Sequence, residues 1–122
     1  MTILEAIQQA DALNPNTYDQ KQKIVWLSRC EASVERFVEQ HEGAEDIPFI
    51  GFDENTSVDT KLLIPQPNDE AYVHWLCANI SLANREVEDY NNFIAMFNTA
   101  MTDFRNWWLH NHLPKNAGRF LF

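Results

Sequence analysis

The sequence contains little glycine, little cysteine and little positive charge, and it has no long apolar run. Three glycines in 122 residues leave few positions for the tight turns of a sheet, so we expect helices. Cys30 and Cys77 lie in apolar helical patterns without Cys-x-x-Cys spacing. This indicates buried thiols of a reducing compartment rather than a disulfide or a zinc site. No stretch approaches the roughly 18 uninterrupted apolar residues of a membrane span.

The shortage of positive charge restricts the classes of partner. Nine Lys and Arg stand against 18 Asp and Glu, which gives a formal net charge of −9. DNA-binding proteins gain most of their affinity by neutralising phosphates with cations, so this charge argues against a dedicated DNA reader and against an anionic membrane surface. The start, MTILEAIQQAD, lacks the cationic region of a signal peptide and reaches Glu5 at once. We therefore expect an intracellular protein whose partners are proteins.

The chain is rich in apolar residues at helical spacing. Its 45% hydrophobic and 12% aromatic content predicts one folded domain over residues 1–122. Thr2 and Glu5 have the spacing of a capping box, Thr-x-x-Glu, before a helical pattern that runs to Leu13. Asn-Pro-Asn at 14–16 should end this first helix.

Further capping signals mark the other helices. Thr17 and Gln20 repeat the spacing of the first capping box and should open a second helix, for which Gly43 is a candidate C-terminal cap. Asn68 and Asp69 can cap a third helix in the same way. The sequence thus predicts helix starts near residues 17 and 69.

An apolar stripe in the second half gives the clearest helical signal. It continues from Val87 to Trp108 at spacings of three and four, as expected for helices that fill a core. A single helix over 69–111 would be roughly 60 Å long, so we expect a break near Asn84. The fold class is therefore mainly α, a small bundle of about four helices. The predicted core comprises Ile24, Leu27, Val34, Leu76, Ile80, Tyr90, Ile94, Phe97, Met101 and Phe104.

Between the second and third helices, residues 44–66 are rich in proline and turn-forming residues. TKLLIP (60–65) pairs with PFIGF (48–52) in a short β-hairpin, or the segment is a long ordered loop; the sequence leaves both open. Loops of this length in small domains often carry function. We therefore expect residues 44–66 to contact a partner.

The string His110-Asn111-His112 has the letters of a nuclease motif but not its arrangement. In those nucleases the three residues are spread over a ββα unit, and on a helix His110 and His112 point about 200° apart. They cannot close on one ion, whereas histidines suit the last turn of a helix that Pro114 ends. Other catalytic signatures, such as a glycine-rich phosphate loop, are absent from the sequence. We expect no enzyme activity, no metal and no cofactor.

Two surface features could contact partners. Glu31, Glu35, Glu39 and Glu42 recur at spacings of four and three, so they should share one acidic helix face. The tail, residues 115–122, ends in apolar side chains that must be covered, either by the chain's own core or by a neighbouring subunit. The candidate subunit or partner contacts are Arg119, Phe120, Leu121, Phe122, Phe49 and Phe52.

Three stretches together resemble a group of small prophage proteins of Gram-positive bacteria. They are ILEAIQQADALNPNTYDQKQKIVWLSRCEASV, DTKLLIPQPNDEAYVHWLCANISLANREVEDYNNFIAMFNTAM and HNHLPKN, in that order, with residues 43–58 the weakest part of the match. These proteins are placed with the phage head–tail connector, or adaptor, proteins. Asn68 stands where the group usually has tyrosine, and Asn84 where glycine is common. Because asparagine tolerates left-handed backbone conformations, Asn84 suits a helix junction.

The resemblance implies a structural role. Proteins of this family assemble as a homo-oligomeric ring beneath the portal, extend the DNA conduit and dock the next neck or tail component, with DNA only as passing cargo. The family has no catalytic residue and no cofactor. The implied location is the bacterial host cytoplasm during assembly and then the neck of the virion.

A second hypothesis starts from the glutamate row. A small acidic phage protein can bind and inhibit a host protein by imitating DNA, and Glu31, Glu35 and Glu39 would then form the contact surface. This hypothesis predicts that neutralising the row abolishes partner binding.

Overall fold

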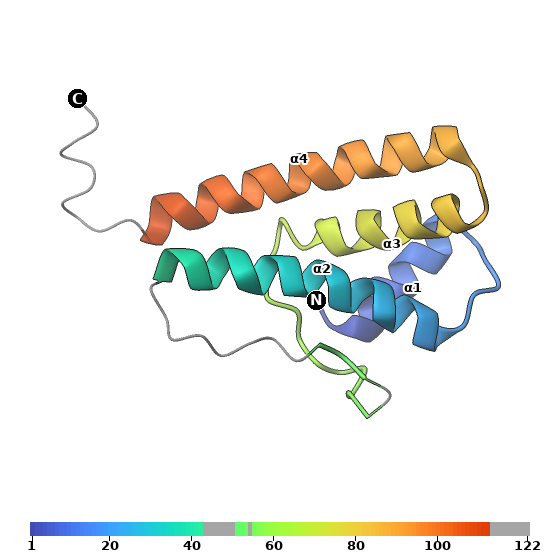
Figure 1. Ribbon diagram of the computed structural model, residues 1–122, viewed down its shortest axis with the longest axis horizontal. Helices are drawn as coiled ribbons and strands as arrows, with labels where there is room; N and C mark the ends of the chain where they lie inside the picture. Colours follow the sequence, from blue (N-terminus) through green and yellow to red (C-terminus); the bar gives the residue numbers. More distant parts are fainter. Residues whose placement is uncertain (43–50, 54, 113–122) are drawn as a thin grey trace.

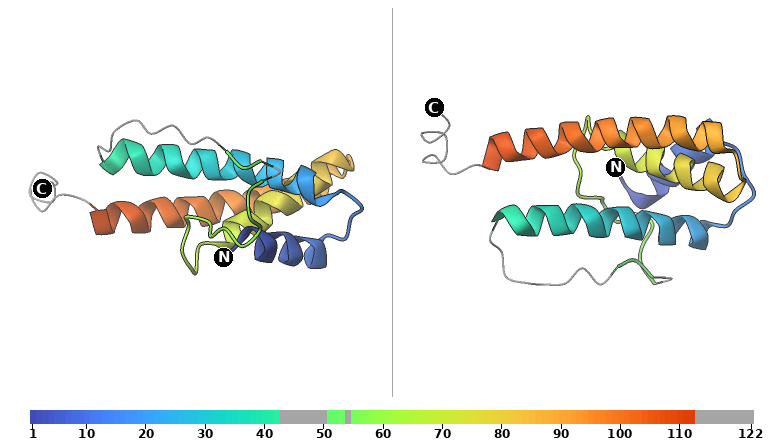
Figure 2. Two further views of the ribbon diagram at one scale, coloured as in Figure 1. Left: turned by 90° about the horizontal axis from the view of Figure 1, so that it is seen from below. Right: turned by 45° about the horizontal axis from the view of Figure 1, so that its top comes forward.

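The computed structural model describes residues 1–42, 51–53 and 55–112. Within these residues the chain forms four helices and no strand: α1 (Ile3–Leu13), α2 (Gln20–Glu42), α3 (Glu70–Ala83) and α4 (Val87–His112). α3 contacts each of the other three helices, and α4 lies alongside it (Figures 1 and 2). None of the four helices has an apolar stretch long enough to cross a membrane. The mainly α-helical bundle of about four helices is confirmed.

α1 begins with the capping box that the sequence predicts. The backbone N–H of Glu5 donates to Thr2 Oγ1 at 3.2 Å, and the backbone N–H of Thr2 donates to Glu5 Oε1 at 3.3 Å. The two bonds satisfy N–H groups that otherwise have no partner within the helix. At the other end, the Asn14 side-chain amide donates to Ser81 Oγ of α3 at 3.0 Å. The end of α1 is thereby held against the end of α3.

The cap of α2 is not the one expected from the sequence. The structure places the helix start at Gln20, and the Asp19 carboxylate accepts the backbone N–H of Gln22 at 2.9 Å. The prediction of a cap at Thr17 is wrong, because Thr17 lies two residues before the position from which a side chain reaches the first turn. Gly43, the expected C-terminal cap, lies outside the described residues.

α3 and α4 are joined by a tight turn. α3 ends at Ala83 and α4 begins at Val87, so the predicted break near Asn84 is confirmed. However, Asn84 stays right-handed (φ −83°, ψ −1°), and Arg85 takes the positive φ of 60°. Asn84 therefore lies at the helix junction as expected but without the left-handed conformation, and Asn84 Oδ1 accepts the Tyr18 hydroxyl at 2.7 Å. This bond connects the α1–α2 linker to the α3–α4 turn.

Residues 58–62 run beside the start of α1. An isolated antiparallel bridge joins Thr2 and Lys61. Three backbone hydrogen bonds of 2.9 to 3.1 Å accompany it, from Leu62 N–H to Met1 O, from Ile3 N–H to Thr60 O and from Leu4 N–H to Val58 O. Residues 48–50, half of the hairpin considered from the sequence, lie outside the described residues, so the choice between hairpin and loop stays open.

At the start of α3, the expected side-chain caps are not formed. Asp69 occupies the capping position, but its carboxylate makes no capping hydrogen bond. The carboxylate Oδ2 lies 3.7 Å from the amino group of Met1 instead. Backbone carbonyls serve the first turn, since Asn68 O accepts from Ala71 N–H and Asp69 O accepts from Tyr72 N–H, both at 3.1 Å. The predicted helix start is confirmed, whereas its capping by side chains is wrong.

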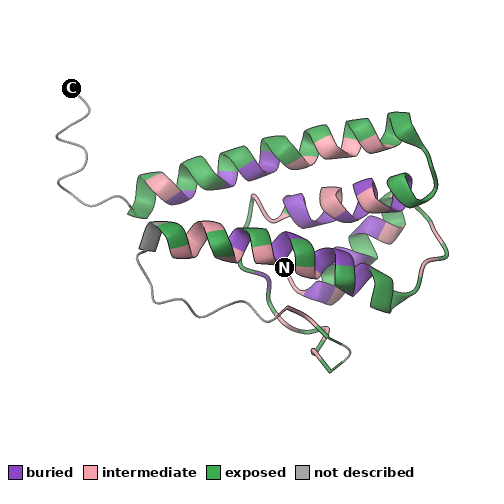
Figure 3. Ribbon diagram, in the orientation of Figure 1, coloured by how far each residue is buried: buried purple, intermediate pink, exposed green. Residues whose placement is uncertain are grey.

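Seven of the ten predicted core residues are buried: Ile24, Leu27, Val34, Leu76, Ile80, Met101 and Phe104. The other three, Tyr90, Ile94 and Phe97, are only half-buried. They lie in the first half of α4, whose outer surface is uncovered in Figure 3. In the second half, Phe37 of α2 packs edge-on against Phe104 and Trp108, with ring centroids 6.0 and 5.5 Å apart. The apolar stripe is therefore core mainly where α2 also reaches α4.

Candidate functional site

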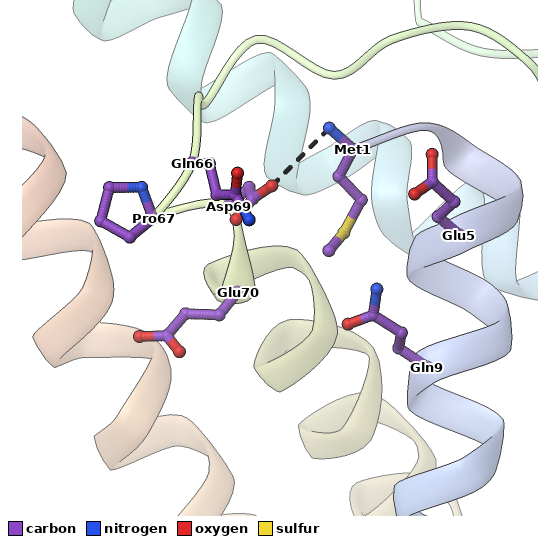
Figure 4. Close-up of a pocket in the computed structure, with 7 residues that line it drawn as sticks. All are labelled: Met1, Glu5, Gln9, Gln66, Pro67, Asp69 and Glu70. Carbon is purple, nitrogen blue, oxygen red and sulfur yellow. Dashed lines mark ion pairs between the residues drawn. The ribbon is translucent and has the colours of Figure 1, made fainter.

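A hollow of about 420 Å³ lies where the first turns of α1 face the start of α3 (Figure 4). Its lining consists of Met1, Glu5, Gln9, Gln66, Pro67, Asp69 and Glu70. Two of the three carboxylates already have partners, since Asp69 is near the Met1 amino group and Glu5 closes the capping box. Figure 4 shows Glu70 pointing away from Glu5. The lining thus brings together neither a nucleophile with a base nor a pair of carboxylates.

The two thiols are buried and uncharged at neutral pH. Burial raises the pKa of the Cys77 thiol to about 11, and the charge of Asp11 adds to the effect. Burial, followed by the charge of Glu31, raises the pKa of Cys30 even further. Nucleophilic cysteines need a lowered pKa, because the thiolate is the reactive form. The interpretation of both cysteines as small buried apolar residues is confirmed.

The two histidines of the His-Asn-His string lie in the last turn of α4. His112 Nδ1 lies 2.8 Å from the carbonyl oxygen of Trp108, and the His112 ring stacks on the Trp108 ring with centroids 4.0 Å apart. The interpretation of these histidines as a helix end is confirmed. In the part of the chain that the structure describes, no three His, Cys, Asp or Glu side chains gather in a way that could hold a metal ion.

Glu31 is a buried carboxylate where α2, α3 and the preceding loop meet. Its side chain is 3% exposed, and it accepts the Tyr72 hydroxyl at 2.6 Å and the backbone N–H of Leu63 at 2.9 Å. The Tyr72 oxygen in turn accepts the backbone N–H of Ile64 at 2.9 Å. Burial raises the pKa of Glu31 above its ordinary value. The hydrogen bonds from Tyr72 and Leu63 oppose this rise, and the charge of Glu35 adds to it. We call Glu31, Tyr72 and the two amides the carboxylate clamp.

The carboxylate clamp corrects the predicted acidic face. Glu31 does not belong to that face, because it lies between Leu27 and Val34 on the buried side of α2 and turns inward. Glu35 and Glu39 are half-exposed, and the side chain of Glu42 lies outside the described residues. The four glutamates do belong to one helix, α2, but their spacing does not show that the row begins inside the core.

The structure places one of the six predicted contact residues. Phe52 is half-buried and packs against the core of its own chain, and its backbone N–H donates to Ser28 Oγ at 3.0 Å. Phe52 therefore contributes to the fold of its own chain, and its ring is only partly accessible to a partner. The remaining five lie outside the described residues: Phe49, Arg119, Phe120, Leu121 and Phe122.

A second buried charge also escaped sequence reasoning. Lys23 is buried, and its Nζ lies 2.8 Å from Asp11 Oδ1 of α1. Lysines are seldom buried without a charged partner, but the only sequence signal is that Lys23 lies beside Ile24 in the apolar pattern. This ion pair joins α1 to α2, and the buried ammonium group is not accessible to another protein.

Sequence reasoning also missed an apolar surface at one end of the bundle. Among the described residues, the most exposed large hydrophobic side chains are Val87 (66%), Leu13 (61%) and Leu82 (55%). Leu13 ends α1, and Leu82 and Val87 flank the α3–α4 turn at the same end of the molecule (Figure 1). We call these three residues the turn-end patch. These residues belong to different connections of the chain, so no local sequence pattern indicates that they lie at one end of the bundle.

Comparison of the chain with protein-family models, with curated proteins and with solved structures gave no match.

Proposed function

We propose that this chain is a structural protein of phage head–tail joining. It assembles as a homo-oligomeric ring at the portal, extends the DNA conduit and docks neck or tail components. The sequence resemblance to the connector group supports the proposal, and a small helical bundle is the fold that this resemblance implies.

The observation that carries the proposal is that charged side chains are buried inside the bundle while large apolar side chains are exposed at one end of it. Glu31 and Lys23 are buried inside the bundle, where Glu31 accepts hydrogen bonds from Tyr72 and Leu63 and Lys23 pairs with Asp11. The three apolar side chains of the turn-end patch are exposed, and we take this end of the bundle as the surface that other copies contact. The net charge of −9 suits a conduit through which DNA slides without being held. Such a division of groups fits a building block better than a catalyst.

The direct test is the mass of the purified protein, measured alone and with the portal ring of the same phage by native mass spectrometry. We expect several copies to bind each portal ring. A chain that stays monomeric and never joins the portal contradicts the proposal. Portal and major capsid genes close upstream of its own gene are a further expected observation.

The alternative, an acidic protein that inhibits a host protein, has less support. Glu31 is fastened inside the core, so a partner would meet only the remainder of the row. Neutralising Glu35 and Glu39 together should abolish host-protein binding under this alternative, whereas unchanged binding eliminates it.

A further inference from the structure

The turn-end patch is held in place by contacts that tie its surroundings together. Asn14, next to Leu13, bonds to Ser81, next to Leu82, and Tyr18 bonds to Asn84 in the turn before Val87. Three apolar side chains are therefore presented by a rigid end of the bundle and not by loose loops. Pre-organised apolar side chains lose little conformational entropy when a partner covers them.

The charge around the patch is negative. Val87 shares a shallow hollow with Glu86, Glu88 and Asp89, all of which are exposed. Arg85 contributes one positive charge to the same turn, so three carboxylates against one guanidinium leave two negative charges over residues 85–89. A complementary partner would present apolar side chains beside positive charge.

The tail of the same chain has that chemistry. Arg119 is followed at once by Phe120, Leu121 and Phe122, and Lys115 adds a second positive charge. Residues 113–122 contain no acidic side chain. Aromatic side chains and arginine are the types that most often anchor protein interfaces.

Binding within a single copy is disfavoured, because the tail begins at the end of α4 opposite to Val87. α4 has 26 residues, so Val87 and His112 are about 38 Å apart at 1.5 Å per residue. The eight residues from His112 to Phe120 span at most about 29 Å even when fully extended. Even fully extended, the tail leaves the backbone of Arg119 and Phe120 short of Val87 of the same chain, which favours the patch of another copy as their binding site.

We propose that Arg119–Phe122 of one copy bind the turn-end patch of the next copy. This inference rests on the ring proposed above and supplies its subunit contact. The contact joins two different surfaces, so copies add head to tail: they close into a ring if the rotation between them permits, and otherwise they extend as an open chain. The first and second copies of a dimer each keep one unused surface, which allows growth.

Cysteine cross-linking tests the contact with the full chain. Equal amounts of the variants V87C and L121C are mixed and mildly oxidised, and the covalent products are identified by mass. The native cysteines are buried and should not react. We expect about ten times more V87C–L121C heterodimer than in the matched mixture of M96C with L121C, because only position 87 lies close enough to position 121 for a disulfide when the tail is bound. Met96 is an exposed apolar residue of the same helix, away from the turn.

Other cross-linked products would indicate other arrangements of the tail and the patch. V87C homodimers in excess would mean that two patches face each other. A cross-link within one chain of the double variant W107C/L121C, without any V87C–L121C product, would mean that the tail folds back on its own helix. Either result overturns the proposal, as does equal cross-linking of V87C and M96C.

A mixing experiment gives an independent readout without cross-links. V87D keeps the tail but loses the patch, and F120S/F122S keeps the patch but loses the tail. Each variant alone should sediment as a monomer, and their mixture should stop at dimers. If F120S/F122S still joins the portal ring with wild-type stoichiometry, the tail contact is wrong while the proposed function survives. If the wild type never joins the portal, the proposed function fails whatever the cross-links show.

Discussion

The interior near Glu31 and the turn-end patch differ in which kind of side chain stands in an unusual place. The interior buries a carboxylate, and the patch exposes apolar side chains. Inside, a carboxylate is 3% exposed, yet both of its acceptor oxygens have hydrogen-bond donors at 2.6 and 2.9 Å. Outside, Leu13, Leu82 and Val87 are each more than half exposed. The buried carboxylate has hydrogen-bond donors within its own chain, whereas the described residues leave these apolar side chains exposed to solvent. The comparison indicates which region completes the fold and which is left for other molecules.

Removing the carboxylate of the clamp should have the largest effect on the stability of the fold. Glu31→Ala leaves the Tyr72 hydroxyl and the Leu63 amide buried without their acceptor, and we expect a loss of about 3 kcal/mol in the free energy of unfolding. Urea denaturation measures it. Glu35→Ala, one turn further along α2 and half-exposed, is the matched control and should cost less than about 0.5 kcal/mol. Equal losses in the two variants would show that Glu31 does not hold these elements together.

The ion pair between α1 and α2 should have a smaller effect. Asp11→Asn leaves the buried Lys23 ammonium with a weaker partner, and we expect a loss of about 1 kcal/mol, because the Asp11 side chain is 40% exposed and solvent screens the pair. Lys23→Met should be nearly neutral, since it removes the charge that needs a partner. The two variants are compared by urea denaturation. A greater loss in Lys23→Met would mean that the pair itself stabilises the fold.

The clamp also predicts a dependence of stability on pH. Burial raises the pKa of Glu31 above its ordinary value of 4.5, so the folded chain binds this proton more tightly than the unfolded chain. Its contribution is complete below pH 4.5 and is lost as the pH rises through the raised pKa. Glu31→Gln should remove this part of the slope, measured as the free energy of unfolding against pH. Parallel curves for the two proteins would contradict the raised pKa.

The turn-end patch should matter least for stability. Leu82→Ser and Val87→Ser alter side chains that are already exposed, so each should change the free energy of unfolding by less than about 0.5 kcal/mol. Thermal unfolding at low protein concentration measures this. A loss as large as that of Glu31→Ala would place these residues in the core of the fold rather than on a free surface.

Much of the fold could be predicted from the sequence because its signals are local. The Thr2–Glu5 capping box, the break at Asn84 and the helix end at His112 each depend on a few neighbouring residues. Ile94 and Phe97 show the limit of such reasoning. The pattern gives the face of the helix on which they lie, but only the packing of α2 determines how much of that face is covered.

The candidate site was less predictable, because its residues meet across the fold. Glu31 lies between the apolar residues Leu27 and Val34 at helical spacing, and this position is a signal that it points inward. Its partners Tyr72 and Leu63 are far away in sequence. The turn-end patch depends on two connections arriving at one end of the bundle. For Leu13 and Val87, local composition offers no indication that they share a surface.

Sedimentation velocity of the wild type and of the L82S/V87S variant, over the same range of protein concentration, tests the central claim most directly. The account predicts that the wild type forms species larger than a monomer, while the double variant sediments as a monomer. At low protein concentration, where both are monomers, the two should unfold at the same urea concentration. A wild type that remains monomeric at every concentration, or a variant that assembles as the wild type does, would contradict the claim that this exposed end joins copies of the chain.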